Sequence, residues 1–162
     1  MIKFIYTIFL SLLIALFVGL GIDAFYQGPK APQYPIELEN ANPNIKLGCE
    51  EPAELIAMRK DFNQAQRSFM EESKPYNRNV SIIALLSAII ILVLSLTLLT
   101  KIKMIADGIL LGGVFTTIYS IIRGLMTENS QFRFLIVVIG LIIALVLGYI
   151  KFIRPRKDLQ EN

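Results

Sequence analysis

The chain has 162 residues, of which 54% are hydrophobic and only 18% are charged. Soluble domains typically carry about a quarter charged residues, so this composition excludes an ordinary soluble domain and favours a chain partly solvated by lipid. The net charge of +3 is too small for a nucleic-acid-binding surface. With no histidine and one cysteine, Cys49, the sequence excludes zinc sites, thiol redox pairs and a nucleophile paired with a histidine base.

Four apolar stretches match the roughly 20 residues that a helix needs to cross a bilayer. The sequence therefore predicts an all-α fold, a four-helix transmembrane bundle with a cytoplasmic tail at residues 154–162. The predicted spans are residues 1–22, 80–100, 104–122 and 134–153.

The first span has an alternative interpretation. Lys3 precedes a long apolar core that ends near the small residues Gly19 and Gly21, a pattern shared with cleavable signal peptides. The core is longer than the roughly 7–15 residues usual in signal peptides, which favours an uncleaved helix. Either interpretation leaves the orientation of the other spans unchanged.

Basic residues close to the helix ends predict the orientation, because they are enriched on the cytoplasmic side. They predict a multi-pass protein of the cell (inner or plasma) membrane, with both termini in the cytoplasm and residues 23–79 outside. The residues assigned to the cytoplasmic side are Lys3, Lys101, Lys103, Lys151, Arg154, Arg156 and Lys157.

Residues 23–79 divide into two parts. Residues 23–50 contain four prolines and predict an extended segment, whereas residues 52–73 predict an amphipathic helix that ends at Lys74–Pro75. The helix has one apolar face, formed by Leu55, Met58, Phe62, Ala65 and Phe69. Five residues are too few for a core, so this face must pack on the extended segment, the bilayer surface, a second copy or another protein. Leu55, Met58, Phe62 and Phe69 are the candidate partner contacts.

The stretch GPKAPQYP at residues 28–35 places Pro29, Pro32 and Pro35 on one edge of a polyproline II helix. This spacing matches PxxP ligands, but its predicted position outside the cell favours a spacer. The junction GLGIDAFYQGPKAPQYP resembles that of small bacterial membrane proteins, in which a first helix runs through an aromatic pair into a proline-bearing external segment. The resemblance implies a bacterial inner membrane and carries no activity.

Small residues spaced four apart indicate where the spans pack closely. The third and fourth spans carry such stripes, which predict either intramolecular packing or contact with a further copy or a membrane protein partner. The candidate packing residues are Gly108, Gly112, Thr116 and Ser120 in the third span, and Gly140, Ala144 and Gly148 in the fourth.

The one candidate intramembrane charge is Asp107, one helical turn after Lys103. Local pairing at the membrane boundary is its simplest interpretation, with cation binding or proton relay as the alternative. We expect no catalytic residue, metal or cofactor. The sequence favours a non-enzymatic accessory protein that presents an external helical arm. The alternative is a small transporter or channel subunit built around the Gly- and Thr-rich third span.

Overall fold

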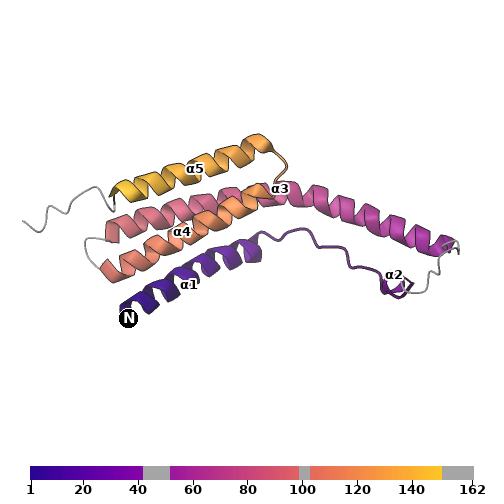
Figure 1. Cartoon of the computed structure of the whole chain (residues 1–162), viewed down its shortest axis with the longest axis horizontal. Helices are drawn as coiled ribbons and strands as arrows, with labels where there is room; N and C mark the ends of the chain where they lie inside the picture. The colour runs from indigo at the N-terminus through magenta and orange to yellow at the C-terminus, as the bar shows by residue number, and fades with distance from the viewer. Residues whose placement is uncertain (42–51, 99–102, 151–162) are drawn as a thin grey trace, which may run out of the picture. The chain divides into compact units, whose positions relative to one another are not determined.

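The computed structural model describes residues 1–41, 52–98 and 103–150, and this part of the chain is helical without any strand. The all-α prediction is confirmed, and four of the helices are long and apolar enough to cross a membrane. In chain order the helices are α1 (Ile2–Phe25), α2 (Ile36–Ala41), α3 (Ala53–Leu98), α4 (Lys103–Leu125) and α5 (Ser130–Gly148) (Figure 1). Cys49 and the predicted tail at 154–162 lie outside the described residues.

The chain forms two compact units. The first, which we call the bundle, contains Met1–Tyr26 and the chain from Asn77 onward. The second, which we call the arm, contains Gln27–Tyr76. Helix α3 contributes its first part to the arm and its second part to the bundle.

Helix α4 is the centre of the bundle, because the other three membrane-spanning helices all pack on it. Gly108 of α4 faces Leu10 of α1, and Gly112 faces Ile14. The contacts follow the same order along both helices, so α1 and α4 run parallel. Helices α3 and α5 run in the opposite direction to α4, and Met1 and the end of α5 lie at the same end of the bundle (Figure 1). Alternating directions are what successive crossings of one membrane require.

The contact between α3 and α4 follows a seven-residue repeat of small side chains. At this spacing two helices stay in contact along a shared seam, as in a coiled coil. On α3 the repeat is Ser81, Ala88 and Ser95, and on α4 it is Ala106, Gly113 and Ser120; all six residues are buried. The hydroxyls of Ser81 and Ser95 donate to the carbonyls of Ser120 and Ala106, respectively, which fixes the antiparallel register.

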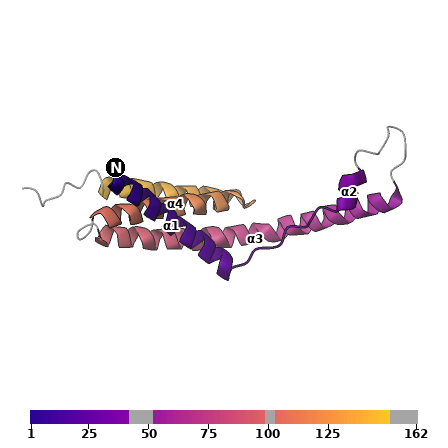
Figure 2. The ribbon, with the colours of Figure 1, turned by 90° about the horizontal axis from the view of Figure 1, so that it is seen from below.

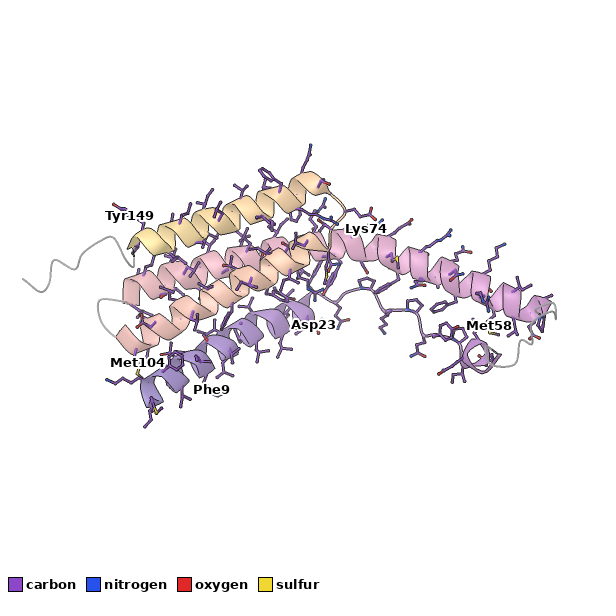
Figure 3. All side chains as sticks on the ribbon, viewed as in Figure 1. Phe9, Asp23, Met58, Lys74, Met104 and Tyr149 are labelled. Carbon is purple, nitrogen blue, oxygen red and sulfur yellow. The ribbon has the colours of Figure 1, made fainter. Side chains whose placement is uncertain are left out.

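Large apolar side chains cover the outside of the bundle, as expected of a surface solvated by lipid. Phe17 of α1 and Phe134 of α5 are 79% and 73% exposed. Phe9 of α1 and Tyr149, directly after α5, are also exposed and are labelled in Figure 3 (Figure 2 shows the helices from a second direction). A soluble fold would bury such residues, so the bundle surface supports a membrane environment.

The predicted helix end at Lys74–Pro75 is wrong, because α3 continues through Pro75 as a single helix. Proline removes one backbone hydrogen bond and usually costs about 3 kcal/mol inside a helix. The residues that follow are held by side-chain contacts that favour continuation. The Tyr76 ring packs on Gly28, and the amide oxygen of Asn77 accepts a hydrogen bond from Arg123.

The segment predicted to be extended also differs, since it contains the short helix α2 at Ile36–Ala41. Pro35 starts this helix: its carbonyl oxygen accepts from the backbone N–H groups of Leu38 and Glu39, at 3.1 and 3.4 Å. Glu37 and Glu39 lie in the first turn, where the helix dipole favours negative charge. The helix predicted at residues 52–73 corresponds to the first part of α3, which begins at Ala53, directly after Pro52.

Candidate interaction surface

The arm is held together by an extended strap, residues 27–35, that lies along α3. At one end of the strap Gly28 lies against the Tyr76 ring, and at the other Tyr34 packs edge-on against Phe62 with ring centroids 5.1 Å apart. Fourteen helical residues separate the two contacts on α3, about 21 Å at 1.5 Å per residue. The six-residue step along the strap covers about 19 Å at polyproline II rise, so an extended chain fits the distance.

Glycine permits a close approach at the first of these contacts. A Cβ atom at position 28 would lie 2.9 Å from both Cε1 and Cζ of Tyr76, closer than carbon atoms pack. A larger residue at this position would force the Tyr76 ring to turn away from the strap. Gly28 therefore permits the strap to approach α3 beside Tyr76.

The three prolines of the strap lie on its covered edge. Pro29, Pro32 and Pro35 are half-buried, whereas Lys30 and Gln33 between them are exposed. This three-residue repeat follows polyproline II geometry. The edge that a PxxP-binding domain would contact is therefore the edge that packs within the arm. The prolines therefore serve the arm's structure.

Among the arm residues whose burial the structure describes, Leu38 of α2 is the least exposed, at 2%. Ile36, two positions earlier on the same short helix, is 68% exposed. Helix α2 thus turns one apolar side chain inward and leaves the other in contact with solvent. Leu38 anchors α2 to the rest of the arm.

The four residues predicted to contact a partner lie together on one face of α3. Leu55, Met58, Phe62 and Phe69 are all half-buried, whereas the residues around them on the helix are mostly exposed. The contact between Tyr34 and Phe62 shows that the strap covers part of this face. The extended segment of the same chain is therefore one of the groups that pack on this face, as one of the predicted alternatives stated.

The predicted packing residues of α4 do not all face the same neighbour. Gly108 and Gly112 face α1, where an added Cβ would lie 2.7 and 2.9 Å from side-chain atoms of Leu10 and Ile14. Thr116 is 1% exposed, and its hydroxyl donates to the carbonyl of Gly112 at 2.9 Å, while Ser120 faces α3. The stripe thus turns from α1 towards α3 along the helix.

The three candidate residues of α5 lie in different surroundings. An added Cβ at Gly140 would lie 2.8 Å from Ile121 of α4. Ala144 is exposed, and a Cβ at Gly148 would meet no atom of the described residues within 4 Å. Only the first part of this stripe therefore faces another helix within the bundle.

Two reciprocal hydrogen bonds join α3 and α4 at Ser81 and Ser120. Each hydroxyl donates to the backbone carbonyl of the other serine at 2.8 Å, and both side chains are fully buried. Because each bond uses its own hydroxyl, removing one serine hydroxyl leaves the other bond intact. Each bond should therefore contribute to stability almost independently.

We expect Ser81→Ala and Ser120→Ala each to lower the free energy of unfolding by about 0.6 kcal/mol, typical of hydrogen bonds between membrane helices. The double variant should lose about twice as much. Unfolding of the purified protein in mixed micelles, followed by circular dichroism, measures all three losses. If the double variant is as stable as the single variants, the two hydrogen bonds do not contribute independently, and the prediction is wrong.

A polar cluster that the sequence did not indicate lies around Arg123 of α4. Its Nη1 donates to Oδ1 of Asn77 at 3.0 Å, its Nε donates to the Tyr119 hydroxyl at 3.2 Å, and its guanidinium lies 5.5 Å from the centre of the Tyr119 ring. Asn77 is 9% exposed. The sequence does place Arg123 and Tyr119 one helical turn apart. Their partner Asn77 lies on α3, however, and this contact depends on how α3 and α4 are aligned.

Asp107, the predicted intramembrane charge, is half-buried near the start of α4. Among the described residues, no group of three or more His, Cys, Asp or Glu side chains is arranged to hold a metal ion.

No family model, curated protein or solved structure matches the chain. Function must therefore be argued from the arm and the bundle themselves.

Proposed function

We propose that this multi-pass membrane protein is a non-enzymatic assembly protein, which anchors the arm beside a membrane and presents it to a protein partner. The observation that carries the proposal is the arm itself. Its strap, α2 and α3 hold one another through Gly28, Leu38 and Phe62, while the helix surface opposite these contacts stays exposed. A preformed helix can bind a partner without a large ordering cost.

The proposed orientation places the arm outside the cytoplasm. The arm connects the first membrane-spanning helix to the second, and the basic residues near the helix ends favour cytoplasmic termini. A partner would then be an extracytoplasmic segment of another membrane or secreted protein.

Burial of the polar side chains of α4 favours assembly over transport. A pore would need hydroxyls that line a water-filled path, but Thr116 and Thr117 are 1% and 6% exposed and donate to the carbonyls of Gly112 and Gly113. Ser120 is bonded to Ser81. These groups are occupied in the packing of a single chain.

The proposal is tested by purifying the tagged protein from its native membranes after crosslinking. Phe62→Asp places a carboxylate against Tyr34 and should release the strap, because a half-buried charge without a partner is costly. We expect this variant to insert normally and to lose most of the partner that the wild-type protein captures, as measured by quantitative mass spectrometry.

Ala65→Asp is the matched control, because it adds the same charge at an exposed position of the same helix, outside the residues that line the groove described below. It should retain the partner. Equal capture by all three proteins, or a wild-type protein that captures none, would contradict the proposed function. Solute flux in proteoliposomes that is abolished by Asp107→Asn would instead favour transport.

A further inference from the structure

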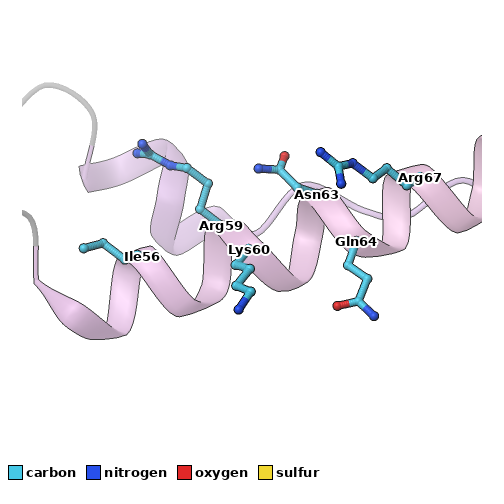
Figure 4. A pocket seen from close by; sticks show the side chains of 6 residues that line it. All are labelled: Ile56, Arg59, Lys60, Asn63, Gln64 and Arg67. Carbon is cyan, nitrogen blue, oxygen red and sulfur yellow. The ribbon is translucent and has the colours of Figure 1, made fainter.

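An open groove of 460 Å³ runs along the arm's part of α3. It is lined by Ile56, Arg59, Lys60, Asn63, Gln64 and Arg67, all exposed and all from this one helix (Figure 4). The residues form two rows at four-residue spacing. One row is Ile56, Lys60 and Gln64, and the other is Arg59, Asn63 and Arg67.

Rows at this spacing are the ridges by which helices pack on one another. A ridge of one helix fits into the groove between two ridges of its neighbour, and pairing of such i±4 ridges is the commonest helix-packing class in globular proteins. The groove spans twelve residues, from Ile56 to Arg67, about 16 Å along the helix. It therefore has the form and length to accept two turns or more of a partner helix.

The walls of the groove are basic. Arg59, Lys60 and Arg67 supply three cations, and Asn63 and Gln64 supply amide groups. The acidic residues Glu54, Asp61 and Glu72 are separated by seven and eleven residues, so they share a different side of the helix. Glu71 lies one turn beyond Arg67, outside the groove.

From this geometry we infer that the groove binds an acidic helical segment of a partner protein, with aspartate or glutamate side chains on the ridge that enters it. Guanidinium groups bind carboxylates in two-pronged pairs, and Lys60 and Arg67 lie on opposite walls, so the entering ridge meets a cation on each side. Ile56, which is 52% exposed, gives one end of the groove an apolar contact.

A second copy of the same chain does not suit this groove. If two copies paired through it, Lys60 and Arg67 of one chain would face cations of the other, and such like-charge contacts are strongly unfavourable. The inference rests on the proposed assembly function and specifies the partner's chemistry. It is nevertheless tested separately, because binding of a defined peptide requires no native partner.

The test uses the full-length protein in phosphatidylcholine nanodiscs and a labelled helical peptide of about 20 residues, long enough to hold a helix. The peptide carries glutamate at successive four-residue positions on one face; a matched peptide carries glutamine there. We expect fluorescence anisotropy to show binding of the glutamate peptide. Binding should weaken about tenfold or more for the glutamine peptide, for Arg67→Glu, and on raising NaCl from about 0.05 to 0.5 M.

Lys30→Glu is the matched control, because it makes the same charge change at an exposed strap position outside the groove. It should bind the glutamate peptide as the wild-type protein does. Equal binding of the two peptides, or an Arg67→Glu variant that binds like wild type, would overturn the inference. So would adsorption to phosphatidylglycerol vesicles that depends on Arg67 while the peptide does not bind.

A photo-crosslinker at Asn63 extends the test to native membranes. The expected product joins Asn63 to an acidic helical segment of another protein, and Arg67→Glu should reduce its yield about tenfold or more. A crosslink to a second copy, or to a partner retained in full by Arg67→Glu, would overturn the inference. In the latter case the proposed assembly function would still stand.

Discussion

Replacing Gly113 by leucine is expected to break the packing of α3 on α4 and to lower the free energy of unfolding by about 3 kcal/mol. A Cβ atom at this position would lie 2.6 and 2.7 Å from Cδ2 and Cγ of Leu92, and 3.3 Å from Ile91. Leu92 is 5% exposed and closely surrounded, so it has little room to move. Unfolding of the purified protein in mixed micelles, followed by circular dichroism, measures the loss.

Gly19→Leu separates this packing effect from a change in hydrophobicity. It adds the same side chain to another membrane-spanning helix, but in the part of the chain that the structure describes a Cβ at Gly19 would meet no atom within 4 Å. The control should therefore unfold within about 0.5 kcal/mol of wild type, as is usual for substitutions that make no new contact. Equal destabilisation by the two leucines would show that Gly113 does not face Leu92 across the α3–α4 contact.

The four membrane-spanning helices could be predicted from the sequence because each depends on one local property, the length of an apolar stretch. The predicted bounds differ by a few residues, since polar residues at the ends can still be helical. Helix α5, for example, begins at Ser130, where the side chain of Asn129 accepts from the N–H groups of Gln131 and Phe132. An asparagine N-cap before the apolar run was a readable signal.

The contact between α3 and α4 was not predicted, although its pattern is present in the sequence. Four-residue spacing selected Gly108 and Gly112, which face α1, and passed over Gly113, which faces α3. The seven-residue repeats around Ala88 and Gly113 carry the information, but they become meaningful only when the two helices are aligned in antiparallel register. Pairing of this kind is a relation between two segments, which a pattern within one segment does not contain.

The strap was missed for the same reason. Its prolines predicted an extended chain correctly for residues 27–35, but nothing local indicates that Tyr34 meets Phe62 or that Gly28 meets Tyr76. The basic groove could have been found from the sequence, since Lys60 and Arg67 share one face of an evident amphipathic helix. The apolar residues that predicted the amphipathic helix lie on a different face.

Leu38→Ala is expected to lower the stability of the arm by about 3 kcal/mol, the usual cost of truncating a fully buried leucine. Because this residue anchors α2, its loss should release the strap and expose residues 27–41 to proteolysis while the bundle stays folded. Limited proteolysis with mass spectrometry measures the rate of cleavage in this segment. Ile36→Ala removes a similar side chain that is 68% exposed on the same helix, so its cleavage rate should stay near that of wild type. Equal rates for the two variants would mean that α2 does not pack through Leu38, and the strap would then be held by its aromatic contacts alone.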